Sequence, residues 1–135
     1  MTTVLSHEIL AAFMATIFQH MPDRKPIALT DRFLNLSPAM RGCALIRDGE
    51  VLAATGDEAD WGSAAGALFE AADAAAGARS TCAHVATEEG ETYAVRLAGA
   101  EMVAVTDRFT LASLVLADMR ATLRELASSR DRVAA

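Results

Sequence analysis

The chain has 135 residues, of which 53% are hydrophobic and only 5% aromatic, and its net charge at pH 7 is −6. This length fits one domain with a single core, and the hydrophobic content excludes a disordered chain. The acidic balance argues against nucleic acid or an anionic membrane as the main partner, because both bind cationic surfaces.

The first predicted element is a helix over residues 4–20, whose apolar positions recur at helical spacing and form a wide face. We expect this helix to dock rather than to project as a free arm. Pro22 and Pro26 then interrupt the pattern, which predicts an N-terminal helix and linker over 1–26, a main domain over 27–129 and a frayed tail over 130–135. The chain has no run of about 20 apolar residues and no signal-peptide pattern, so we expect a cytoplasmic protein with no membrane span.

A short helix is predicted over 29–36, with Thr30 or Asp31 as its N-cap. Strands follow over 43–47 and 50–55, joined by Asp48-Gly49, which favours a type I′ hairpin turn with positive φ at both positions. An alanine-rich helix is predicted over 60–77. Asp60 is expected to cap its start, and Gly77 its end.

Three short strands are predicted next, over 80–87, 92–98 and 101–106, followed by a last helix over 109–128. This order of hairpins and helices predicts an α+β domain, in which one five-stranded antiparallel sheet carries helices on its faces. It excludes a Rossmann fold, because no glycine-rich phosphate loop occurs.

Two stretches carry a resemblance to a known family: LSPAMRGCALIRDGEVLAATG and AVRLAGAEMVAVTDRFTLASLVLADMRATLREL. With the alanine-rich helix between them, the chain from Leu29 to Ser128 resembles the roadblock (roadblock/dynein light chain) domain, which has a profilin-like fold. The resemblance implies strand order 2-1-5-4-3, with helices on both faces. It also implies dimers that pair their third strands and lay their middle helices side by side. Members of this family scaffold or regulate small Ras-like GTPases, including those of bacterial gliding motility. The helix at 4–20 lies outside the family pattern.

The strand over 80–87 lies at an edge of the sheet in this order, and it has neither charge nor proline. Such an edge invites another strand to pair with it, and a second copy of the chain would satisfy both edges in a two-fold dimer. The alternative is that a loop or the N-terminal helix covers the edge. The predicted dimer interface combines this strand with the middle helix: Ser80, Cys82, Ala83, His84, Val85, Trp61, Ala65, Leu68, Phe69 and Ala72.

Several residues are candidates for chemistry. Cys82 and His84 share one face of their strand, but a metal site needs further ligands, so a small buried thiol and an interface or surface imidazole are the simpler interpretation. The acidic stretch 57–62 lacks the glutamate that closes an EF-hand, and is better explained as a helix start. Trp61 is either a core or dimer anchor or part of a partner surface.

Glu88, Glu89 and Glu91 are predicted to form a charged turn tip, which is either simply solvated or meets a cationic partner. No catalytic constellation, metal site or cofactor motif is present in the sequence. The resemblance to the roadblock family and the uncharged edge strand lead us to predict a non-catalytic, dimeric regulator or scaffold that binds a small GTPase or another signalling protein. The alternative is a small-molecule sensor with a pocket between sheet and helix. Arg47, Arg79 and Arg108 are available as arginine fingers, but nothing singles out one of them.

Overall fold

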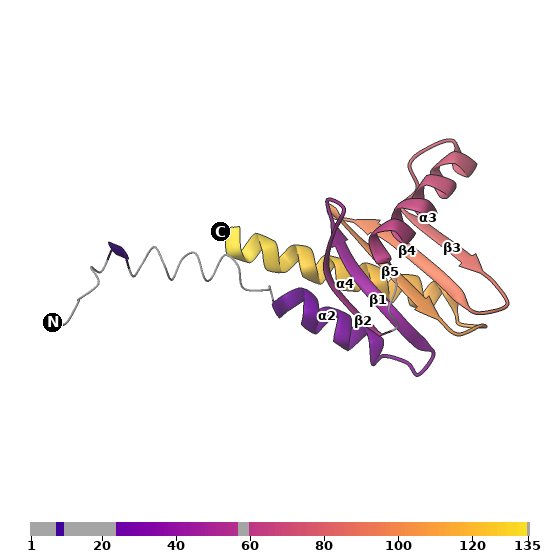
Figure 1. Ribbon diagram of the computed structural model, residues 1–135, viewed down its shortest axis with the longest axis horizontal. Helices are drawn as coiled ribbons and strands as arrows, with labels where there is room; N and C mark the ends of the chain where they lie inside the picture. The colour runs from indigo at the N-terminus through magenta and orange to yellow at the C-terminus, as the bar shows by residue number, and fades with distance from the viewer. Residues whose placement is uncertain (1–7, 10–23, 57–59, 135) are drawn as a thin grey trace.

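The computed structural model of the protein describes residues 8–9, 24–56 and 60–134 (Figure 1). The helix predicted over 4–20, apart from residues 8 and 9, and the stretch 57–59 with Asp57 and Glu58 therefore lie outside the described residues. Within the described part of the chain, no helix is long and apolar enough to cross a membrane. The elements are α2 (Arg24–Leu34), β1 (Met40–Arg47), β2 (Glu50–Gly56), α3 (Trp61–Ala76), β3 (Cys82–Ala86), β4 (Glu91–Leu97), β5 (Ala100–Thr106) and α4 (Ala112–Ala134).

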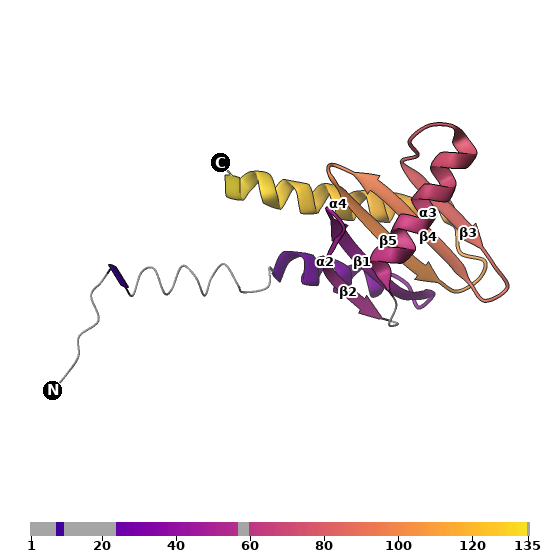
Figure 2. The ribbon, with the colours of Figure 1, turned by 45° about the horizontal axis from the view of Figure 1, so that its top comes forward.

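The five strands form one antiparallel sheet in the order β2-β1-β5-β4-β3, which confirms the predicted fold class and strand order. Figures 1 and 2 show the resulting three layers, with α2 and α4 on one face of the sheet and α3 on the other. β2 and β3 are the two outer strands.

Each face of the sheet has its own hydrophobic core. On the α2/α4 face, Phe33 of α2 and Met119 of α4 pack with strand residues such as Leu45 and Tyr93. On the opposite face, α3 packs against the sheet through three buried side chains, Trp61, Ala65 and Phe69. Among the helices that the structure describes, α3 is the one that packs on the second face.

The predicted hairpin turn and the predicted caps of α3 are confirmed. Asp48 and Gly49 both have positive φ, 51° and 79°, as a type I′ turn requires. The Asp60 carboxylate accepts a hydrogen bond from the backbone N–H of Ser63 at 3.4 Å, and Gly77 ends α3 in the left-handed conformation.

The predicted start of the first domain helix was wrong. α2 begins at Arg24 rather than at residue 29, so Pro26 lies in its first turn, where the missing N–H is tolerated. Neither Thr30 nor Asp31 is the cap. Thr30 is buried inside the helix, and its hydroxyl donates to the backbone carbonyl of Ile27 at 2.9 Å.

The predicted limits of the last helix also differ from the structure. Phe109 has a φ of 64°, which a right-handed helix does not accept, and α4 begins only at Ala112. At its other end α4 continues to Ala134, past the end predicted at residue 128.

Candidate interaction surface at the β3 edge

The outer side of β3 pairs with no other strand in the described part of the chain. Toward β4, the Thr81 carbonyl accepts from the Arg96 N–H and the Thr87 N–H donates to the Gly90 carbonyl, both at 2.8 Å. Backbone polar groups alternate in direction along a strand, so residues between these two follow the same parity. The N–H and C=O groups of the even-numbered residues, Cys82, His84 and Ala86, therefore point outward, ready to pair with another strand.

The side chains of β3 add nothing that would repel a partner strand. Within Cys82–Ala86 there is no charged residue and no proline. Val85 is 44% exposed, and Ala86 is exposed beside it. An uncharged, regular outer strand of this kind is one that monomeric proteins ordinarily avoid.

A polar cluster holds the start of β3 against α3 and β4. The Asp73 carboxylate of α3 accepts from the Ser80 N–H at 2.7 Å and from Arg96 Nη1 at 3.2 Å. Arg96 Nη1 also donates to the Ser80 carbonyl at 3.1 Å, and its guanidinium lies 3.9 Å from the centre of the Phe69 ring. The hydrogen bond from Ser80, then the ion pair with Arg96, lower the pKa of the Asp73 carboxyl. The start of β3 is thus fixed to both of its neighbours.

A second polar cluster holds β3 from the opposite face of the sheet. Glu91 of β4 is only 8% exposed, and its carboxylate accepts from both the hydroxyl and the backbone N–H of Thr110. These bonds, helped by His84, lower the pKa of the Glu91 carboxyl. His84 Nε2 lies 3.2 Å from the same carboxylate, and the imidazole stacks on Tyr93 with ring centres 4.2 Å apart. Glu91 therefore connects the edge strand to the segment that leads into α4.

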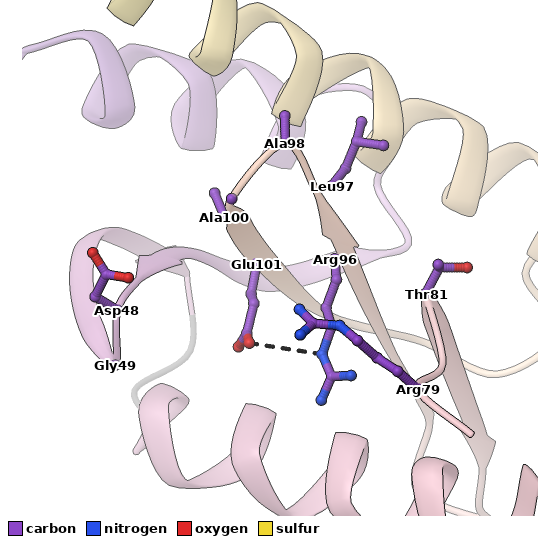
Figure 3. A pocket seen from close by; sticks show the side chains of 10 residues that line it. Asp48, Gly49, Arg79, Thr81, Arg96, Leu97, Ala98, Ala100 and Glu101 are labelled. Atoms are coloured by element: carbon purple, nitrogen blue, oxygen red, sulfur yellow. Dashed lines mark ion pairs between the residues drawn. The ribbon is translucent and has the colours of Figure 1, made fainter. Parts of the chain in front are cut away.

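A hollow of about 390 Å³ opens beside the start of β3 (Figure 3). Arg79 and Arg96 point into it, and Glu101 pairs with Arg96 Nε at 3.8 Å. The turns at Asp48-Gly49 and Ala98-Gly99 form the rest of its wall. Its cationic and anionic side chains are balanced, so the hollow shows no clear preference for a charged ligand. It lies at the end of the sheet, not between sheet and helix where the sensor hypothesis requires a pocket.

The structure places the predicted interface residues in two groups. Trp61, Ala65 and Phe69 are buried inside the protomer, so they support α3 rather than offer a surface, in agreement with the core interpretation of Trp61. The remaining residues are half-buried or exposed along β3 and α3: Leu68, Ala72, Ser80, Cys82, Ala83, His84 and Val85.

Burial and position bear on two of the chemical interpretations. Cys43 lies on β1, which β5 and β4 separate from β3, and the described residues hold no group of three or more metal-ligating side chains. The prediction that Glu91 belongs to a solvated turn tip was wrong. Only Glu88 and Glu89 occupy the exposed tip, because Glu91 is the first residue of β4 and faces the α4 side.

Sequence reasoning missed both polar clusters. Asp73 and Arg96 are 23 residues apart, and Glu91 and Thr110 are 19 apart, so no local pattern joins them. A weak signal existed in each case. Asp73 interrupts an alanine run, and Arg96 is a lone charge in an otherwise uncharged strand segment.

Comparison with known proteins supports a roadblock-type fold. The sequence matches no protein-family model and no curated protein. Solved structures do match. A Roadblock/LC7 domain from Streptomyces avermitilis superposes with a TM-score of 0.64 at 16% identity, covering 80% of this chain and 97% of that one.

Two further solved structures have the name MglB. The gliding protein MglB from Thermus thermophilus has a TM-score of 0.60 at 21% identity, covering 79% of this chain and 89% of that one. An MglB with a tetrameric arrangement has a TM-score of 0.61 at 23% identity, covering 79% and 88%. The protein therefore has the fold of a roadblock-type domain, as its sequence resemblance implied.

Proposed function

We propose that the protein is a non-catalytic, dimeric regulator or scaffold of the roadblock type, and that its partner is a small Ras-like GTPase. The observation that carries the proposal is the open edge at β3. Its outward N–H and C=O groups, lack of charge and exposed Val85 fit a strand that pairs with another copy of the chain.

Two-fold pairing would extend the sheet across both protomers and place the two copies of α3 on the same face. The exposed outer side of α3 is rich in small residues, including Gly66, Ala67 and Ala71, which present no bulk to a neighbouring surface. This platform is supported by the likeness to the Roadblock/LC7 and MglB structures. The GTPase partner follows from the family resemblance of the sequence.

The dimer is tested by size-exclusion chromatography with light scattering, where we expect twice the chain mass at micromolar concentration. A chain that stays monomeric up to about 100 μM would disprove the pairing, since functional homodimers form well below that concentration.

The partner is tested with the purified GTPase from the same organism, loaded with GDP or with a non-hydrolysable GTP analogue. We expect binding that differs between the two nucleotide states, measured by calorimetry, together with a changed rate of GTP hydrolysis or nucleotide exchange. A control GTPase from a distant organism should not bind. If the GTPase binds in neither nucleotide state, it is not the partner, and the proposed dimer is unaffected by that result.

A further inference from the structure

An exposed apolar corner lies where the end of α2 meets the start of α4. Its four large apolar side chains, Leu36, Phe109, Leu111 and Leu114, are each more than half exposed. All four border one hollow of about 290 Å³. Single exposed leucines are ordinary on a protein surface, but four large apolar side chains around one hollow indicate a surface that another segment covers.

The backbone holds Phe109 outward at a cost. Its φ of 64° lies in the left-handed region, which a bulky residue rarely adopts, and the next residue, Thr110, is fixed by the Glu91 carboxylate at 2.9 Å from its backbone N. The Arg108 guanidinium lies 4.6 Å from the centre of the Phe109 ring, and it forms no ion pair with the described residues. The corner thus combines an apolar hollow with a cation that lacks a carboxylate partner in this part of the chain.

The segment before α2 has the composition to cover this corner. Residues 4–20 have apolar positions at helical spacing, with Leu5, Ile9 and Phe13 four residues apart. Only three residues separate the end of this predicted helix from Arg24, where α2 begins. Two helices joined by so short a loop are ordinarily antiparallel neighbours, so the predicted helix would return along α2 toward the corner.

The rise of the two helices sets which residues come level. Both rise about 1.5 Å per residue, so residues equally far from the loop lie opposite one another. Leu36 lies 12 residues after Arg24, and Glu8 lies 12 residues before His20. Glu8 and Ile9 therefore come level with Leu36 at the corner. Glu8 is the one carboxylate in residues 4–20, and it arrives where Arg108 is available.

We propose that residues 4–20 form a helical strap that closes over the corner of its own chain, with Ile9 in the hollow beside Leu36 and Glu8 paired with Arg108. The structure describes the open state, in which Figure 1 shows residues 8 and 9 away from the corner and Ile9 is 58% exposed. Closure requires neither the dimer nor the GTPase. A closed strap would keep the corner from the apolar surface of any other protein.

The same geometry argues against two other places for the strap. α2 packs against β1 and β2, and β3 is the outer strand at the far side of the sheet, so a helix that returns along α2 does not reach the β3 edge. Docking on a second copy is also less favourable. A tether of three residues gives the chain's own strap an effective concentration of about a millimolar or more, which a second chain at micromolar concentration does not match.

The position of the strap is tested by a disulfide between Ile9→Cys and Leu36→Cys, in a Cys82→Ser background that leaves only the buried Cys43. A glutathione redox buffer measures the effective concentration of the two new thiols. We expect a disulfide within one chain, seen as a monomer on non-reducing electrophoresis with both new thiols blocked from labelling.

The matched control combines Ile9→Cys with Val51→Cys. Val51 is 46% exposed, close to Leu36 at 54%, but it pairs with Ile46, whose side chain belongs to the core under α3. Cross-strand partners share a face of the sheet, so Val51 lies on the face opposite the corner. The effective concentration of this second pair should be at least tenfold lower. Circular dichroism checks that both variants are folded.

The charge pair is tested in the Ile9→Cys/Leu36→Cys chain. Glu8→Arg and Arg108→Glu should each lower the effective concentration about threefold, as expected for one exposed ion pair replaced by repulsion, and the two changes together should restore it. A salt titration gives the same answer independently, because the difference between these variants should shrink as the ionic strength rises.

The outcomes separate the strap from the proposed function. Equal effective concentrations for the 9/36 and 9/51 pairs would overturn the strap, and a 9/36 disulfide found only between two chains would show that the segment covers the corner of a second copy instead. A 9/36 disulfide that does not respond to the charge variants would overturn the pairing of Glu8 with Arg108. None of these results decides whether β3 forms the dimer or whether a GTPase binds.

Discussion

The two edges of the sheet differ in what they offer to another chain. β2 is joined to β1 through a register shift between Leu45 and Ile46, it begins at the charged residue Glu50, and α2 packs against it. β3 pairs with β4 in an unbroken register and has no charge along its length. A bulge bends and twists a strand, so β2 is a poor template for a further strand, whereas β3 is a good one. Of two strands that are equally outermost, only β3 is suited to association.

The largest effect on the dimer should separate two matched valines. Val51 on β2 and Val85 on β3 are 46% and 44% exposed, so each accepts a lysine without loss of core packing. Val85→Lys places a charge in the proposed interface and should weaken the dimer about 30-fold, or about 2 kcal/mol. Val51→Lys should leave the dimer unchanged. Sedimentation equilibrium measures the dimer dissociation constants of both variants. A dimer lost only in Val51→Lys would show that β2 is the interface.

A second variant should damage the β2 edge without affecting association. Gly56 has a φ of 91°, and a Cβ there would lie 2.2 Å from the backbone oxygen of Arg41. Gly56→Ala should therefore lower the free energy of unfolding by about 2–4 kcal/mol, through strain and the displacement of β1. Gly66→Ala in α3 is the control, since nothing lies within 4 Å of its Cβ and helix propensity favours alanine by about 1 kcal/mol.

Urea unfolding at a fixed protein concentration measures both glycine variants, while the dimer constant is read separately from dilution. We expect Gly56→Ala to change the free energy of unfolding much more than the dissociation constant of the dimer. If it instead abolished the dimer under conditions where the chain is still folded, the two edges would not be independent.

Most of the frame of the molecule was predictable from its sequence because the signals are local. Asp48-Gly49 predicted the hairpin, and Asp60 and Gly77 predicted the ends of α3. The lack of charge in the strand predicted the open edge. The start of α2 was missed because Pro26 also fits a break in the helical pattern, although proline is accepted in the first turn.

The clusters that hold β3 in place depend on contacts between distant residues, and no spacing rule predicts those. Glu91 shows this best, because in the sequence it belongs to an acidic run with Glu88 and Glu89. Only the strand order shows that it lies beneath the segment leading into α4.

A smaller effect concerns Glu91 and pH. Its carboxyl pKa is lowered in the folded protein, so the ionised form contributes stability at pH values above the unfolded pKa of about 4.3. This contribution is lost as the pH falls through the folded value. Glu91→Gln should be less stable than wild type at pH 7, and the difference should shrink progressively below about pH 4.5. Glu88→Gln, at the exposed turn tip, is the control for the change in net charge. If the free energies of unfolding of wild type and Glu91→Gln differed by a constant amount from pH 7 to pH 3, the ionised Glu91 carboxylate would not be the source of this stability.

The smallest effect concerns the two cysteines, which report on the interior and on the edge. Burial raises the pKa of the Cys43 thiol to about 12, and its Sγ lies 3.5 Å from the Thr30 carbonyl, so it should not react with a thiol reagent at pH 8 until the protein unfolds. Cys82 is half-buried on the edge strand and should react in the native state. If a second β3 covers this edge, its labelling rate should rise several-fold on dilution below the dimer dissociation constant. Val85→Lys should label at the fast rate at every concentration, and Cys82→Ser should not label at all. A wild-type rate independent of concentration would mean that the β3 edge stays open in the assembled protein.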